Sequence, residues 1–239
     1  MEIDKRTLAR TGGIGLLAAV VLAAIVWGGW TLIRGKSEVD TALDQIRRVP
    51  LIGPVMAENS AVESRMRTAI EEELKSPTRT GLSRPFSLVA EIRGQYIVPS
   101  LRAADDASAM AAVAARAELV GYLRRTDPAA CRQMALGALQ RPDLLDTEGQ
   151  RLFAQVLQTL EAAWRNGKKA GKPQPVLNRE ELLAVLQEAG FTKADFDRLA
   201  AFATLSNEVS CDVELKVDSL PPQLPADKRG PFARYILGN

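Results

Sequence analysis

The sequence contains no histidine, and only two of its 239 residues are cysteine. The lack of histidine excludes Ser-His-Asp and Cys-His triads, HExxH metalloproteases and most zinc enzymes, because each of these sites needs an imidazole as base or ligand. Two cysteines without histidine also fail to complete a structural zinc site. We therefore expect no metal, no cofactor and no catalytic residues, and the sequence favours a protein that is not an enzyme.

Aromatic residues make up only 5% of the chain, and neither sign of charge dominates, since the formal net charge is +2. A balance so close to zero gives no reason to expect nucleic acid as a partner. Much of the apolar content is Ala and Leu, which favours helices over sheets. The Ala- and Arg-rich composition is typical of a bacterial protein from a GC-rich genome. We predict an all-α fold.

Residues 12–33, GGIGLLAAVVLAAIVWGGWTLI, form an uncharged run of 22 residues. Such a run is long enough to cross the hydrocarbon core as a single helix. It is longer than the apolar core of a signal peptide, and no small-x-small cleavage site lies just beyond its apolar end. Trp27, Trp30 and Arg34 stand at its far end, where the membrane interface is expected. The sequence predicts an uncleaved anchor rather than a cleaved signal or a buried helix of a soluble protein.

Flanking cations do not decide the orientation of this anchor, since three precede it and four follow it by residue 48. Long domains translocate largely regardless of such charges, and the first helix usually sets the topology. We expect a single-pass inner-membrane protein with a cytoplasmic N-terminus and a periplasmic domain. The predicted order is 1–11 cytoplasmic tail, 12–33 transmembrane helix, 34–57 juxtamembrane connector and 58–239 helical extracytoplasmic domain.

Cys131 and Cys211 lie too far apart in sequence for a CxxC redox motif. In an oxidising compartment the natural interpretation is one disulfide closing a loop of roughly 80 residues. The alternative is two buried free thiols that behave as small apolar residues.

The domain has about seven predicted helices, and two segments leave the choice between helix and strand open. Residues 86–98 and 207–220 each fit a helical face and also an alternating strand pattern. A strand in one segment needs the other as its partner, which leaves a minor β pairing as the alternative. We favour helix in both, partly because Pro85 is suited to a first helical residue.

Residues 166–177, NGKKAGKPQPVL, are predicted to be a linker after a helix that ends at about Arg165. Its cations Lys168, Lys169 and Lys172 are candidates for contact with anionic lipid headgroups or an acidic partner, although such a run is usually solvated. The apolar stretch within the connector, residues 49–56, either rests on the membrane surface or packs on the domain. Small residues flanking the anchor also leave a homo-oligomer open.

The leading functional hypothesis is a membrane-anchored helical interaction or accessory module of the cell envelope, with the lipid bilayer and an envelope protein as partners. A cytoplasm-facing regulatory tether is one alternative. A cell-wall glycan hydrolase acting through a carboxylate such as Glu63 is another. Glu63-Ser64, with Gly81-Leu82 downstream, resembles the Glu-Ser and Gly-Leu-Met-Gln motifs of lytic transglycosylases over four residues. Ser83 and Arg84 stand where that family has Met-Gln.

Overall fold

The computed structural model describes residues 37–75, 83–136, 139 and 142–238. Every regular element in these ranges is helical, which confirms the all-α prediction. Among the described helices, none combines the length and the hydropathy that crossing a bilayer requires.

The predicted anchor falls outside the described ranges. Residues 1–11 and 12–33, together with the interface candidates Trp27, Trp30 and Arg34, all precede residue 37. The transmembrane part of the fold prediction therefore stays a prediction.

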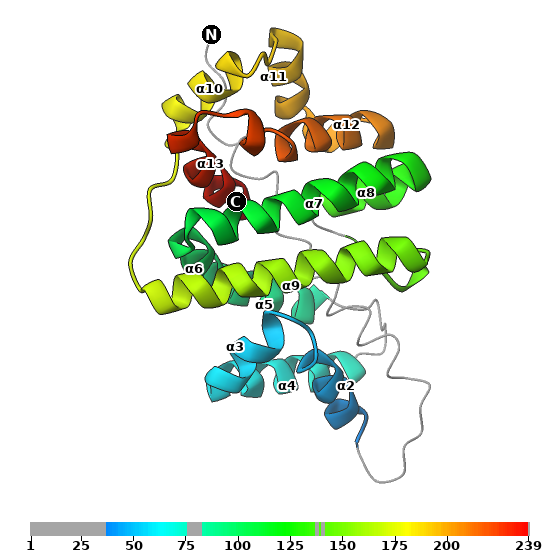
Figure 1. Ribbon diagram of the computed structural model, residues 1–239. Coiled ribbons are helices and arrows are strands. Elements are labelled where there is room, and N and C mark those ends of the chain that lie inside the picture. The colour runs from blue at the N-terminus through cyan, green and yellow to red at the C-terminus, as the bar shows by residue number, and fades with distance from the viewer. Residues whose placement is uncertain (1–36, 76–82, 137–138, 140–141, 239) are drawn as a thin grey trace.

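The helices stack in layers (Figure 1). Two long antiparallel helices, α7 and α9, run side by side across the middle of the molecule. The N-terminal helices lie on one side of this pair and the C-terminal helices on the other. A continuous apolar core runs through the stack, so the described helices form one folded unit.

The predicted connector belongs to this unit. It forms α2 (Glu38–Ile46) and α3 (Ile52–Glu58), which pack on α4 (Ser60–Lys75). Ile52 and Val55 are wholly buried, so the stretch 49–56 packs on the domain, which is one of its two predicted alternatives. Between the helices, the buried Leu51 adopts φ 69° and ψ −52°, and the Ile52 N–H donates to the Pro50 carbonyl at 2.9 Å. Burial of the Leu51 side chain offsets the strain of this γ-turn.

The helix predicted over 86–98 is confirmed. It consists of α5 (Ser83–Ile92), the π-helical turn η2 (Arg93–Ile97) and α6 (Val98–Ala103). Pro99 explains the wide turn, because its ring leaves no room for a carbonyl one α-turn earlier and it has no N–H to donate. The indole of the buried Trp164 donates to the Tyr96 carbonyl at 3.0 Å and so ties the turn to α9.

The central pair consists of α7 (Asp106–Thr126) and α9 (Thr147–Ala170). An aspartate precedes each helix and caps it by accepting a backbone N–H hydrogen bond. This residue is Asp105 for α7 and Asp146 for α9. The predicted end of α9 near Arg165 is wrong, since the helix continues to Ala170 and the linker begins only at Gly171. The prediction ended the helix too early because Gly167 was expected to break it. In the structure Gly167 lies within the helix and packs against α6.

Gly167 lies at a close approach of α6 and α9, because a Cβ there would stand 1.7 Å from the Ser100 carbonyl oxygen. We expect Gly167→Ala to lower the free energy of unfolding by about 2 kcal/mol or more, since backbone must move to make room. Gly94→Ala is the matched control, because apart from the neighbouring backbone of its own helix no atom lies within 4 Å of its Cβ position. Thermal unfolding of both variants checks this, and equal midpoints would contradict the close approach.

Most of the remaining helices form the layer beyond α7, whereas η3 contacts α9. The described helices α2–α13 outnumber the predicted seven, because Pro, Gly and Asp residues divide the chain more finely than the apolar pattern suggests. The segment 207–220 is helical, so the alternative β pairing with 86–98 does not occur. The bounds are α8 Pro128–Ala135, η3 Pro142–Leu144, α10 Arg179–Glu188, α11 Lys193–Ala200, η4 Phe202–Thr204, α12 Asn207–Asp218, η5 Pro221–Gln223 and α13 Ala226–Gly238.

Candidate functional site: the groove beside α12

Helix α12 is held at its N-terminal half by the predicted disulfide. Cys131 of α8 and Cys211 of α12 are bonded, with their Cα atoms 5.7 Å apart, and both side chains are wholly buried. The structure thus has the predicted pairing and no free thiol at either position. The bond fixes one end of α12 against α8 and thereby against the core.

The side of α12 that faces α7 carries a buried ionic cluster. Glu214 and Asp218, one turn apart, approach Arg116 of α7, and all three residues are at most 6% exposed. The Arg116 Nη2 contacts the Glu214 carboxylate, and its Nε lies 3.4 Å from the Asp218 Oδ2. One guanidinium therefore serves two carboxylates in the interior.

Asp218 is the less satisfied of the two carboxylates. Its side chain has no solvent exposure, and neither oxygen accepts a hydrogen bond from any described residue. Burial raises the pKa of Asp218 to about 6, against the opposing attraction of Arg116. Because an uncompensated carboxylate is costly in a low-dielectric interior, protonation of Asp218 is favoured there.

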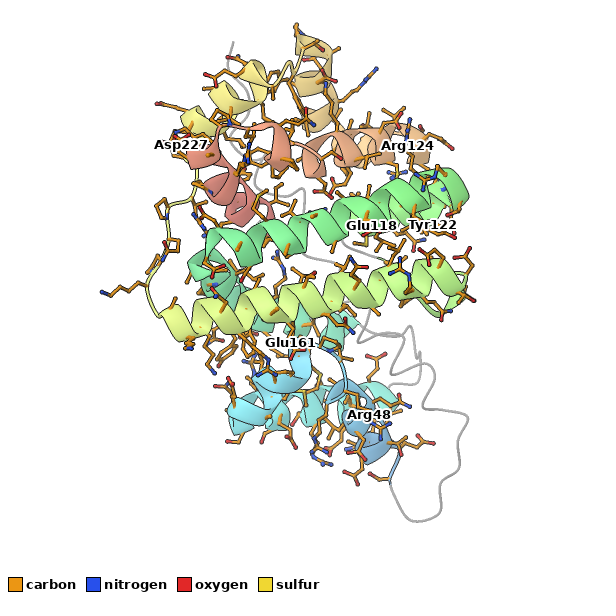
Figure 2. The ribbon with its side chains drawn as sticks, viewed as in Figure 1. Arg48, Glu118, Tyr122, Arg124, Glu161 and Asp227 are labelled. Atoms are coloured by element: carbon orange, nitrogen blue, oxygen red, sulfur yellow. A yellow bond between two sulfur atoms is a disulfide. The ribbon has the colours of Figure 1, made fainter. Side chains whose placement is uncertain are left out.

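The other side of α12 lines an open groove of about 320 Å³. From α7 the lining includes Arg124, which lies between α7 and α12 (Figure 2), and the end of α10 contributes Ala189. Apolar residues and uncharged polar residues contribute together to the lining. The lining residues are Arg124, Ala189, Asp212, Leu215, Lys216, Ser219, Leu220 and Gln223.

The charged residues of the groove are paired with one another or with the neighbouring hairpin of α10 and α11. Arg124 pairs with Asp212. Lys216 donates to Asp195 of α11 at 2.8 Å, and its ammonium lies 4.2 Å from the centre of the Phe191 ring. The bond from Lys216 and those from Thr192 lower the pKa of Asp195 to about 2. The groove therefore presents no unbalanced charge, and its specificity would come from apolar contact and from Ser219 and Gln223.

A second groove, of about 390 Å³, lies between α4 and α5 and is spanned by the ion pair of Arg65 and Glu91. Glu63, the carboxylate of the hydrolase alternative, lines neither this groove nor the one beside α12. It forms an ion pair with Arg47 instead. Gly81 and Leu82 of the same resemblance lie outside the described residues, so the hydrolase alternative stays a prediction.

The three candidate lysines are separated by the true end of α9. Lys168 pairs with Glu58 of α3 and lies 5.4 Å from the centre of the Trp164 ring. With Lys169 it occupies the last turn of α9, where cations complement the helix dipole. Lys172 is exposed in the linker. Contact of these residues with an anionic surface stays a prediction, which now depends mainly on Lys169 and Lys172.

The buried cluster was not predicted from the sequence, although two patterns indicate it. Arg116 stands within the apolar stripe of α7, between Ala112 and Leu119. Glu214 and Asp218 follow Cys211 at helical spacing, so a buried cysteine at 211 implies that the two acids face the core as well.

Comparison of the chain with protein-family models, with curated proteins and with solved structures gives no match. Within the described part of the chain, no group of three or more His, Cys, Asp or Glu side chains is placed to hold a metal ion. The chemistry of the site therefore has to be argued from its own residues.

Proposed function

We propose that the chain is a non-enzymatic interaction module of the bacterial cell envelope, anchored in the inner membrane by residues 12–33. Its N-terminus lies in the cytoplasm and its helical domain in the periplasm. The groove beside α12 docks a segment of another envelope protein. The observation that carries this proposal is the groove itself, whose lining is partly apolar and whose charged residues all have ion-pair partners.

The chemistry of the groove supports a protein segment as its occupant. Leu215 and Ala189 offer apolar contact, while Ser219 and Gln223 offer hydrogen-bonding groups. Because Arg124 and Lys216 already have carboxylate partners, an anionic ligand would gain little there. A short segment with an apolar anchor and a polar rim matches this lining.

The disulfide supports placement of the domain outside the cytoplasm. Structural disulfides persist in oxidising compartments, and the bond between Cys131 and Cys211 joins two helices of the core. The uncharged run 12–33, which ends four residues before the first described residue, supports a tether that holds the domain close to the bilayer.

Partner recovery after mild crosslinking in native membranes tests the docking function. Ser219→Trp fills the groove, and we expect it to reduce recovery of the partner at least tenfold. Gln158→Trp, on the exposed face of α9, is the matched control and should leave recovery unchanged. If Ser219→Trp misfolds, Gln223→Trp at the exposed rim replaces it. Equal recovery from groove and control variants, or no reproducible partner for the unmodified chain, would contradict the proposal.

A further inference from the structure

The cluster of Arg116, Glu214 and Asp218 changes its charge balance with the protonation of a single group. When both carboxylates are ionised, the interface of α7 and α12 holds one positive and two negative charges. When Asp218 is protonated, the charges match one to one. Because the cluster is closed to water, solvent does not screen the electrostatic effect of this difference in charge.

Other ionisable groups next to α12 interact with partners other than Asp218. On α8, Arg132 donates to the Ala203 carbonyl at 2.8 Å. On α11, Asp195 pairs with Lys216, and at the end of α7 Arg124 pairs with Asp212. The buried Arg93 of η2 and Arg116 repel each other electrostatically. The Arg93 guanidinium donates a hydrogen bond to the Leu237 carbonyl of α13 at 3.4 Å. Arg116 is therefore the cation that faces Asp218.

The cluster and the groove are formed by the same turns of α12. Leu215 and Ser219, which line the groove, directly follow Glu214 and Asp218 in the sequence. The disulfide at Cys211 holds the preceding turn on α8. A change in how α12 packs on α7 must therefore appear in its C-terminal half, where the groove is.

We propose that the buried cluster of Arg116, Glu214 and Asp218 makes the packing of α12 on α7 sensitive to pH and so regulates the groove. This inference rests on the proposed docking function and on a domain that experiences the pH outside the cytoplasm. Acidification tightens α12 on α7, and neutral pH loosens it.

The direction follows from linkage. The pKa of Asp218 is raised in the folded state, from an ordinary value of 3.8 to about 6. The packed helix thus binds the proton more tightly than the opened one, and packing is most favourable at low pH. This advantage is lost as the pH rises through about 6. Between pH 5.0 and 7.5 the equilibrium constant for opening of α12 should rise about tenfold.

Hydrogen exchange of the purified full-length chain, without any partner, tests the inference. Protection of the amides of α12 is measured at pH 5.0 and 7.5, with exchange times scaled for the intrinsic pH dependence of exchange. We expect protection to fall about tenfold at the higher pH in the unmodified chain. Asp218→Asn should abolish the pH dependence and keep protection high at both values. Asp212→Asn, which removes an exposed carboxylate from the same helix, should leave the tenfold change intact.

Equal protection of α12 at both pH values, or a tenfold change that persists in Asp218→Asn, would overturn the inference. If Asp218→Asn does not fold, Asp218→Ser provides a second uncharged replacement. The measurement needs no partner, so failure of the docking proposal in the crosslinking experiment is a separate result. A pH-dependent α12 without a recoverable partner would refute docking, whereas a partner with a pH-independent α12 would refute only the switch.

Discussion

Replacing Cys131 and Cys211 together by alanine is expected to lower the free energy of unfolding by about 4 kcal/mol. The bond joins residues that are 80 positions apart, and a loop of that length loses much conformational entropy in the unfolded chain. For a domain of this size the loss corresponds to a fall in the melting temperature of about 10 °C.

Denaturant unfolding of the oxidised chain, the reduced chain and the double alanine variant measures this effect. The reduced chain and the variant should unfold at similar denaturant concentrations, below the oxidised chain. Reductant should not change the double alanine variant, which serves as the control. A variant as stable as the oxidised chain would show that the disulfide does not stabilise the packing of α8 on α12.

Replacing Arg116 by methionine should cost about 3–5 kcal/mol at neutral pH, because it leaves Glu214 and Asp218 buried without a cation. The loss should shrink under acidic conditions, where protonation removes the uncompensated charge. Adding Glu214→Gln and Asp218→Asn to the same chain should recover most of the stability, since neutral side chains replace the whole cluster.

Arg124→Met is the matched control for this series. Arg124 also pairs with a carboxylate of α12, but the pair is about half exposed, so its loss should cost less than about 1 kcal/mol. Urea unfolding at pH 5.0 and 7.5 gives both comparisons. Equal losses for Arg116→Met and Arg124→Met, or no rescue in the triple variant, would contradict a buried cluster that needs its cation.

Local sequence patterns predicted most of the helices, because apolar periodicity and capping residues act within a few turns. Ser60 and Glu63 match a capping box, which predicts a helix from about 60 to 75, and α4 spans Ser60–Lys75. The N-cap pattern at Asn178 likewise predicts the start of α10, which Asn178 caps. The cysteine pair was predictable for a different reason, since two cysteines allow only one intramolecular pairing.

The rest depends on contacts between distant residues. Gly167 lies within a helix where Ser100 of α6 and the following Ala104 approach it, and the sequence of α9 alone contains no sign of that approach. Leu51 adopts a positive φ because its side chain is buried in the core. The groove beside α12 requires α7, α12 and the hairpin of α10 and α11 to be placed together, which no local pattern specifies.

The most direct test of the account is the accessibility of Cys131 and Cys211 in intact cells, because it reports compartment and disulfide together. Cells are quenched rapidly with acid, denatured, and treated with a bulky maleimide with and without prior reduction. An anchored module with its domain outside the cytoplasm predicts modification only after reduction. Full modification without reduction would contradict that claim and would move the search for partners to the cytoplasmic face of the membrane.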